Sequence, residues 1–428
     1  MVGVGFFAPL IYALAQTWHR LDDAFGTSAV HAPPDGGDAA VAPVGSVAFQ
    51  HELRRFTQTA MEPGHRVELL VDGPMTLAHL DQDLRRARSS IAVQSYYCEP
   101  GVVADWLRDR LIERARAGVR VRFLRDGFGC NSLTAGWIDS LQRSGAIVAT
   151  LRPVRWWAIH ESMHRSHVRI VTIDGAIGYV GGFGIADKWI DHGGEPRWRE
   201  SAARFTGPAV SQLATAFAVG WLNATGTMLT GPSLAAPPAV PSPEGGAAAG
   251  VMFTQRAYGT PVPERFLALA IAAARKRVWI ANSYFVPNAA LRGWLIAAAR
   301  RGVDVRVLAP SATIDIPFTR WAGRSTFPEL LHGGVRIYEY LPAMMHAKAM
   351  IIDDEFASIG SLNLDNLSLR INDEAVLHVQ DRAFVEIMAA QYEKDLSRSI
   401  EITPDLLRAA SLRERFMTAI AGMVRNLL

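Results

Sequence analysis

Short apolar runs and amphipathic stretches alternate along most of the chain, separated by polar turns rich in Gly and Asp. Short apolar or alternating runs predict strands, whereas longer stretches with apolar positions every three or four residues predict helices. In the first half this pattern predicts strands at 66–71, 90–97, 119–124 and 145–151, and helices at about 75–87 and 102–117. Alternation of strands and helices is typical of an α/β fold.

The same order of elements returns in the second half of the chain. Residues 95–97 (SYY) correspond to 283–285 (SYF), each after an apolar strand and before a helix. Further on, 117–122 (AGVRVR) corresponds to 301–306 (RGVDVR), and 144–148 (SGAIV) to 333–337 (GGVRI). Self-similarity of this kind predicts a duplication of one α/β unit.

Two stretches rich in Ala, Pro and Gly, at 27–46 and 225–250, predict linkers. The predicted organisation is an apolar N-terminal segment with a linker (1–48), a first domain (49–224), a linker (225–250), a second domain (251–402) and an amphipathic C-terminal helix (403–428). Residues 2–18 carry no charge and lie at the short limit of about 17 residues for a membrane span. That segment either contacts a membrane or docks on the folded body as an apolar helix.

Composition narrows the function classes. The formal net charge of +3 gives no strong signal for nucleic-acid binding. Only four of the 44 basic residues are Lys, so a Lys inside a motif is informative. The two cysteines, Cys98 and Cys130, form neither a metal-type spacing nor a disulfide framework, which indicates a reducing compartment.

One stretch of the second half, 346–374, has the character of an anion site. Side chains alternate faces along a strand, so His346 and Lys348 are expected to point the same way. Ser361 and Asn363 follow in a polar loop after a predicted strand–turn–strand unit. An imidazole beside an ammonium, a hydroxyl and an amide can hold an anion and transfer a proton.

The duplication predicts a counterpart of this stretch, and the first half contains one. His167 precedes Asp174 by the same seven residues that separate His346 from Asp353. Glycine follows each Asp after seven more residues, and a glutamate opens the next predicted strand in both halves, at Glu200 and Glu374.

A doubled His-x-Lys-x4-Asp pattern with Gly-Ser-x-Asn resembles the phospholipase D superfamily. The resemblance extends over 66–399, and the segments VELLVDG (67–73), WRE (198–200) and YFVP (284–287) are similar to bacterial cardiolipin synthases. It implies two pseudo-symmetric phospholipase D-like domains, each a mainly mixed β-sheet flanked by helices, with the active site at their interface. Such enzymes usually carry two N-terminal spans, and this chain is more similar to the short form that lacks them.

The resemblance also implies residue roles. His167 would be the nucleophile, and His346 the general acid and then the general base. Glu200 and Glu374 would bond the far nitrogens of the two histidines. Asp174 and Asp353, grouped with the catalytic residues by the motif, sit where a hairpin turn is expected, so a structural and electrostatic part is expected of them. The phosphate oxygens would be held by Arg169, Lys348, Ser361 and Asn363.

The first motif departs from the family pattern at three positions. Arg169 stands where Lys is usual, Gly182 replaces Ser, and Gly184 replaces Asn. Losing the hydroxyl and the amide removes hydrogen-bond donors from this half. His164 and Arg165, just upstream, could supply replacement donors or could lie in a solvated loop.

The function implied is a phosphatidyltransferase similar to cardiolipin synthase, working through a phosphohistidine and passing the phosphatidyl group between phospholipids, phosphatidylglycerol foremost. A phospholipase D hydrolase and a non-catalytic lipid-binding protein are the alternatives, and a nucleic-acid phosphodiesterase is disfavoured by the small net charge. The expected partners are phospholipids and a membrane surface, on the cytoplasmic side, without nucleic acid. No metal or cofactor is expected.

Overall fold

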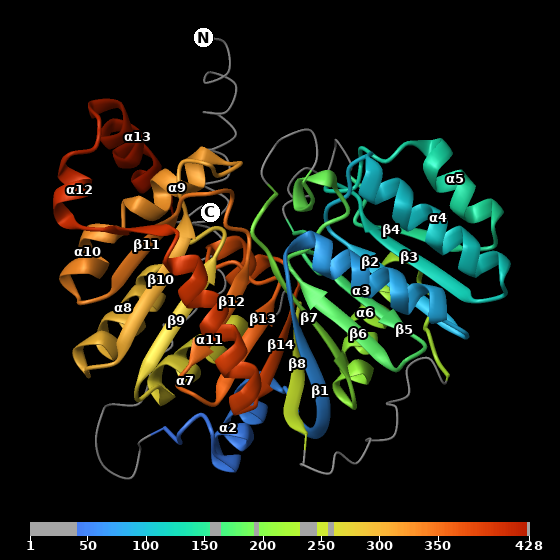
Figure 1. Cartoon of the computed structure of the whole chain (residues 1–428), viewed down its shortest axis with the longest axis horizontal. Coiled ribbons are helices and arrows are strands. Elements are labelled where there is room, and N and C mark those ends of the chain that lie inside the picture. The colour runs from blue at the N-terminus through green and yellow to red at the C-terminus, as the bar shows by residue number, and fades with distance from the viewer. Residues whose placement is uncertain (1–40, 155–163, 192–196, 232–245, 256–260, 426–428) are drawn as a thin grey trace.

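The computed structural model describes residues 41–154, 164–191, 197–231, 246–255 and 261–425. These residues form one sheet of fifteen strands with helices on both faces (Figure 1). The strand order is β15-β11-β10-β9-β12-β13-β14-β8-β1-β7-β6-β5-β2-β3-β4. The two halves lie side by side in Figure 1, with the first half in blue and green and the second in yellow to red.

The first half contains α2 (Val47–Thr57), β1 (Glu62–Val71), α3 (Asp72–Arg86), β2 (Ser90–Ser95), α4 (Val102–Arg116), β3 (Arg120–Asp126), α5 (Ala135–Arg143), β4 (Ile147–Leu151), β5 (Ile170–Ile173), β6 (Ile177–Gly181), the short 3-10 helix η2 (Asp187–Trp189), β7 (Ser201–Thr206) and α6 (Ala209–Thr225).

The second half contains β8 (Ala247–Thr254), α7 (Val262–Ala273), β9 (Arg277–Asn282), α8 (Ala289–Arg300), β10 (Asp304–Pro310), α9 (Pro317–Arg324), α10 (Phe327–His332), β11 (Arg336–Tyr340), β12 (Lys348–Ile352), β13 (Phe356–Gly360), the π-helical turn η4 (Leu367–Ile371), β14 (Glu374–Gln380), α11 (Arg382–Leu396), β15 (Ser399–Ile402), α12 (Pro404–Arg408) and α13 (Leu412–Met423).

The predicted duplication is visible in the pairing of the strands. Parallel strands β2, β3 and β4 join the antiparallel strands β5, β6 and β7, and β9, β10 and β11 join β12, β13 and β14 in the same way. The predicted α/β class with mixed sheets flanked by helices is therefore confirmed. The two sheets are continuous, because β8 pairs with both β14 and β1 at the centre.

The repeated turns between helix and strand rest on glycine at matching positions. Gly118 follows α4 and Gly302 follows α8, with φ of +87° and +90°. Glycine adopts this left-handed region without the clash that a Cβ would cause. The Gly-Val pairs that precede β3 and β10 therefore have the same backbone conformation.

Three boundaries differ from the predicted ones. β8 begins at Ala247, inside the predicted linker 225–250, because six of its eight residues are buried and its backbone pairs with β14 and β1. The helix α2, assigned to the first domain, packs against α7 of the second half, where Phe49 and Leu53 join the core. The predicted C-terminal helix is two helices, α12 and α13.

Most of the predicted N-terminal apolar segment, 1–40, lies outside the described residues. Across the described ranges, none of the helices combines the length and apolar character that crossing a bilayer requires.

Candidate active site

The two histidines lie at the same edge of the sheet, one before β5 and one before β12. The His167 N–H donates to the Asp373 carbonyl at 2.9 Å, and the Asp373 N–H donates to the Arg165 carbonyl at 3.0 Å. In the same way, the His346 N–H donates to the Arg199 carbonyl at 2.7 Å. Each histidine segment therefore bonds to the segment that carries the glutamate of the opposite half.

These backbone bridges produce crossed His–Glu pairs. His167 Nδ1 lies 3.0 Å from Glu374 Oε1, and His346 Nδ1 lies 2.5 Å from Glu200 Oε2. All four side chains are buried. A proton on Nδ1 held by a carboxylate fixes the tautomer in which the reactive lone pair is on Nε2. The predicted bonds between the glutamates and the far nitrogens are therefore present in the geometry, each across the boundary between halves.

A basic side chain from each motif lies beside its histidine. Arg169 donates from Nη2 to His167 Nε2 at 3.0 Å, and Lys348 Nζ lies 3.0 Å from both ring nitrogens of His346. Both cations are buried. A phosphate that reached the two imidazoles would therefore meet one cation from each half, which is the arrangement that stabilises charge on transferring phosphoryl oxygens.

Burial sets the protonation of the site. Burial first, and then the charges of Arg169 and Lys348, hold the pKa of both imidazoles well below the ordinary value. Burial also raises the pKa of Glu374 to about 8 and lowers the pKa of Lys348 to about 7. Both imidazoles are therefore neutral, as a nucleophile requires.

In the second half, Ser361 and Asn363 support the site through protein contacts. The Ser361 hydroxyl donates to the Glu374 carboxylate, and it accepts the Ala375 N–H at 3.1 Å. Asn363 Oδ1 accepts a hydrogen bond from the Ser283 hydroxyl at 2.7 Å. Ser361 thus orients Glu374, the partner of His167. Of these two side chains, only Asn363 keeps a donor, its amide NH₂, for a phosphate.

In the first half, an indole takes the place of the missing donors. Trp189 Nε1 donates to Glu200 Oε2 at 3.3 Å. A Cβ at Gly182 would lie 2.6 Å from the Glu200 carboxylate, and one at Gly184 would lie 2.6 Å from the Trp189 ring. The two glycines therefore make room for the tryptophan and the glutamate, so the departures from the family motif form one coupled set.

Sequence reasoning missed Trp189. The simultaneous loss of Ser and Asn at matching positions was the signal that another donor had to serve Glu200.

Aromatic rings enclose both histidines. The Tyr96 ring centroid lies 4.9 Å from that of His167, and the rings of Trp189 and Trp198 lie 5.4 Å and 5.0 Å from that of His346. Tyr284, the repeat partner of Tyr96, lies 6.4 Å from His346. These rings exclude water from the imidazoles and strengthen the electrostatic interactions there.

Asp174 and Asp353 occupy the far ends of the motif strands. Both have positive φ in a hairpin turn. The Asp353 carboxylate accepts the backbone N–H groups of residues 275–277, and Asp174 accepts those of residues 88–90. Seven residues of strand place them roughly 20 Å from the histidines. The structure therefore does not bring these two aspartates to the reacting groups, and their contacts are structural.

His164 and Arg165 are tied into the protein. His164 Nε2 lies 2.8 Å from Asp373 Oδ1, and Arg165 donates to the Arg152 carbonyl at 3.0 Å and lies 3.4 Å from Asp126. They support the segment before His167 and are not the replacement donors.

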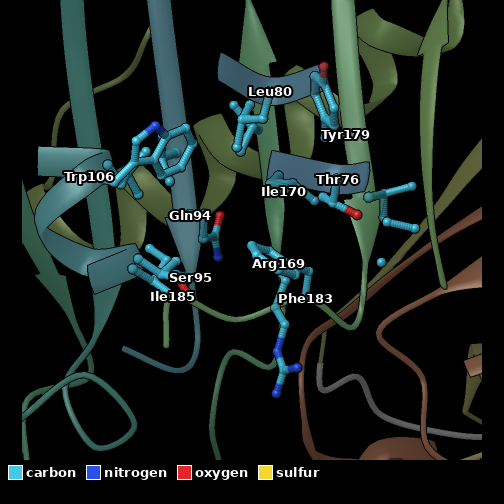
Figure 2. A pocket seen from close by; sticks show the side chains of 17 residues that line it. Thr76, Leu80, Gln94, Ser95, Trp106, Arg169, Ile170, Tyr179, Phe183 and Ile185 are labelled. Atoms are coloured by element: carbon cyan, nitrogen blue, oxygen red, sulfur yellow. The ribbon is translucent and has the colours of Figure 1, made fainter. Parts of the chain in front are cut away.

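A small cavity lies behind the first motif, between the sheet and helices α3 and α4. Figure 2 shows its mostly apolar lining and the Arg169 side chain, whose guanidinium extends away from the other labelled residues. The volume is about 50 Å³, whereas ligand pockets span roughly 300–1,000 Å³. Arg169 thus closes the cavity on the side of the histidines.

Comparisons with known proteins identify relatives of this chain. Residues 267–396 match the family described as "Cardiolipin synthase, PLD-like domain". A cardiolipin synthase of Halalkalibacterium halodurans is 31% identical over 84% of this chain and 72% of its own. Cardiolipin synthase A of Pseudomonas putida is 32% identical over 85% and 75%. The crystal structure of phosphatidylserine synthase from Haemophilus influenzae has a TM-score of 0.66 at 12% identity, covering 89% of this chain and all of that one, which is a likeness of fold.

Proposed function

Because the chain belongs to the cardiolipin synthase family of the phospholipase D superfamily, we propose that it transfers a phosphatidyl group from one phosphatidylglycerol to the hydroxyl of a second. The observation that carries the proposal is the pair of crossed His–Glu contacts, 3.0 Å at His167 and 2.5 Å at His346. They hold the Nδ1 atom of each imidazole and leave the two Nε2 atoms, which Arg169 and Lys348 contact, as the reacting atoms of one site.

In the first step, His167 Nε2 attacks phosphorus and the bond to the glycerol oxygen breaks. His346 Nε2–H gives its proton to that oxygen, and glycerol leaves. His346 must be protonated on both ring nitrogens for this step. Burial, and then the charges of Lys348 and Arg169, hold the pKa of His346 down, and the arriving phosphodiester anion offsets the two charges.

In the second step, the hydroxyl of the acceptor lipid attacks the phosphohistidine. Neutral His346 takes the hydroxyl proton, the P–N bond breaks, and His167 returns to its starting state. The products are glycerol and a lipid with four acyl chains. The positive charge that develops on each ring favours the ionised form of its glutamate, so Glu374 and Glu200 then hold the Nδ1 protons and stabilise that charge.

Donor and acceptor are both lipids, so we place the protein at a membrane surface. Its two cysteines are free thiols, which supports the cytoplasmic side.

Incubating the protein with phosphatidylglycerol alone tests the proposal. Equal amounts of free glycerol and of a four-chain lipid are expected. Phosphatidic acid as the product would show hydrolysis instead. Lipid binding without turnover would show a non-catalytic lipid-binding protein. Either result would overturn the proposal.

A further inference from the structure

The helix α13 carries a stripe of exposed apolar side chains. Leu412, Phe416 and Met423 are 82%, 65% and 83% exposed, and Ile420 is 39% exposed. At 3.6 residues per turn these positions fall on one side of the helix. Arg413 and Arg415 flank the stripe on its two sides.

The opposite side of α13 is fixed to the protein. Ala421 is fully buried beside α9. Glu414 lies 2.9 Å from Arg320 and accepts a hydrogen bond from Arg324, both on α9. The apolar stripe is therefore held outward on an anchored helix.

The stripe lies on the side of the molecule that carries the two histidines. The helix α9 begins two residues after Asp315, whose carboxylate accepts the Tyr284 hydroxyl at 2.9 Å. The Tyr284 ring contacts His346. In Figure 1, α13 and α9 lie at the top of the molecule, and α2 lies at the bottom.

Other exposed apolar residues follow the carboxyl ends of the parallel strands, which meet at this same edge. They come from both halves: Phe128 after β3, Val154 after β4, Ile316 after β10 and Leu341 after β11. We call these four residues together with the stripe on α13 the docking face.

We propose that the docking face seats the protein on the surface of a bilayer that contains anionic phospholipid, with α13 lying in the interface. This rests on the proposed function, which requires lipids at the histidines. The charges favour lipid over a second copy of the chain. Arg413 and Arg415 line the stripe with positive charge, which two paired stripes would bring together, whereas anionic headgroups neutralise it.

The test uses flotation of the full chain with vesicles of phosphatidylcholine, with and without phosphatidylglycerol. The Phe416→Ser/Met423→Ser variant is expected to bind about tenfold or more weakly, because two large apolar side chains no longer enter the interface. The matched control is Val47→Ser/Ile387→Ser, whose side chains are 64% and 57% exposed away from the docking face. It should bind like the parent.

Two results would overturn the proposal: equal binding of the two double variants, or a lipid-free dimer of the parent that the Phe416→Ser/Met423→Ser change dissociates. Turnover of dispersed short-chain phosphatidylglycerol, measured on the same samples, reports the proposed function separately. It should be unchanged in the variant. If this turnover is absent even in the parent while vesicle binding still depends on α13, the proposed function is wrong but the proposed docking face is supported.

Discussion

At the scale of single residues, two glutamates receive the same support from different donors. Ser361 donates to Glu374, whereas the indole of Trp189 donates to Glu200. The neighbouring glycines leave the space that the indole and the carboxylate need. A motif that reads as degenerate in the sequence therefore keeps a hydrogen-bonded glutamate in the structure.

Replacing Trp189 with Phe keeps the ring and removes this donor. We expect kcat to fall about tenfold to a hundredfold with little change in KM, since a hydrogen bond to a charged group contributes about 1.5–3 kcal/mol and the change acts through His346. Trp137→Phe is the matched control, because the Trp137 Nε1 is buried without a hydrogen-bond partner. Equal kcat values for the two variants would contradict the role assigned to the indole.

Lys348 gives the binding of an anion at the site a pH dependence. Burial lowers its pKa to about 7, so its charge is present below that pH and lost above it. A short phosphodiester inhibitor, whose own charge is constant, should bind more weakly as pH rises above about 7, by up to tenfold per unit. Lys348→Arg should flatten the profile.

Lys276→Arg is the control for this profile, because Lys276 is exposed and pairs with Asp354 at the far end of β12. It should leave the profile as it is. If Lys348→Arg does not change the profile either, the loss of inhibitor binding at high pH does not come from deprotonation of Lys348.

At the scale of elements, the repeat and the alternation of side chains along a strand were sufficient to predict much of the site. His346 and Lys348 do face the same place, and the first half holds its counterpart in register. The positions of Trp189 and of the opposite-half glutamates could not be predicted. They depend on how the segments before β5 and β12 cross between halves, and no local pattern records such a contact.

The hairpin turns are a second case in which local chemistry predicted the outcome. An Asp at a turn favours local backbone contacts, and Asp353 accepts three backbone N–H groups of the neighbouring segment. Asp353→Ala should lower the free energy of unfolding by about 3 kcal/mol, because those donors lose a charged acceptor and alanine adopts the positive φ less readily than aspartate. Urea titration followed by tryptophan fluorescence measures this.

The neighbouring change, Asp354→Ala, removes only partly exposed ion pairs with Lys276 and Arg277 and should stay within about 1 kcal/mol. At low temperature, the folded Asp353→Ala protein should keep its kcat. A large loss of kcat in fully folded protein would give Asp353 a direct part in the reaction.

At the scale of the whole molecule, the two halves share one sheet and one active site. The sheet is continuous through β14, β8, β1 and β7, and each histidine pairs with the glutamate of the other half. The duplication indicated two motifs in register, and the resemblance implied one active site at the interface of the halves. Neither indicated that the sheets would merge or that the His–Glu pairs would cross.

The assembly of the site within one chain can be checked by mixing variants. His167→Ala and His346→Ala should each lower kcat by at least about a hundredfold, as expected for the loss of an attacking group or of an acid–base group. A mixture of the two should remain as inactive as either alone. Recovery of activity on mixing would show that sites form between chains.

Trapping the covalent intermediate in the His346→Ala variant tests most directly whether His167 is the nucleophile. A phosphatidyl ester of p-nitrophenol has a leaving group that needs no acid, so His167 can still attack, while the acceptor hydroxyl lacks its base. We expect a burst of p-nitrophenol equal to the enzyme present and a phosphatidyl group on His167, found by mass spectrometry after an alkaline quench. His167→Ala should give neither. A modified His346 in the His167→Ala variant, or no burst in the His346→Ala variant, would contradict the role of His167 as the nucleophile.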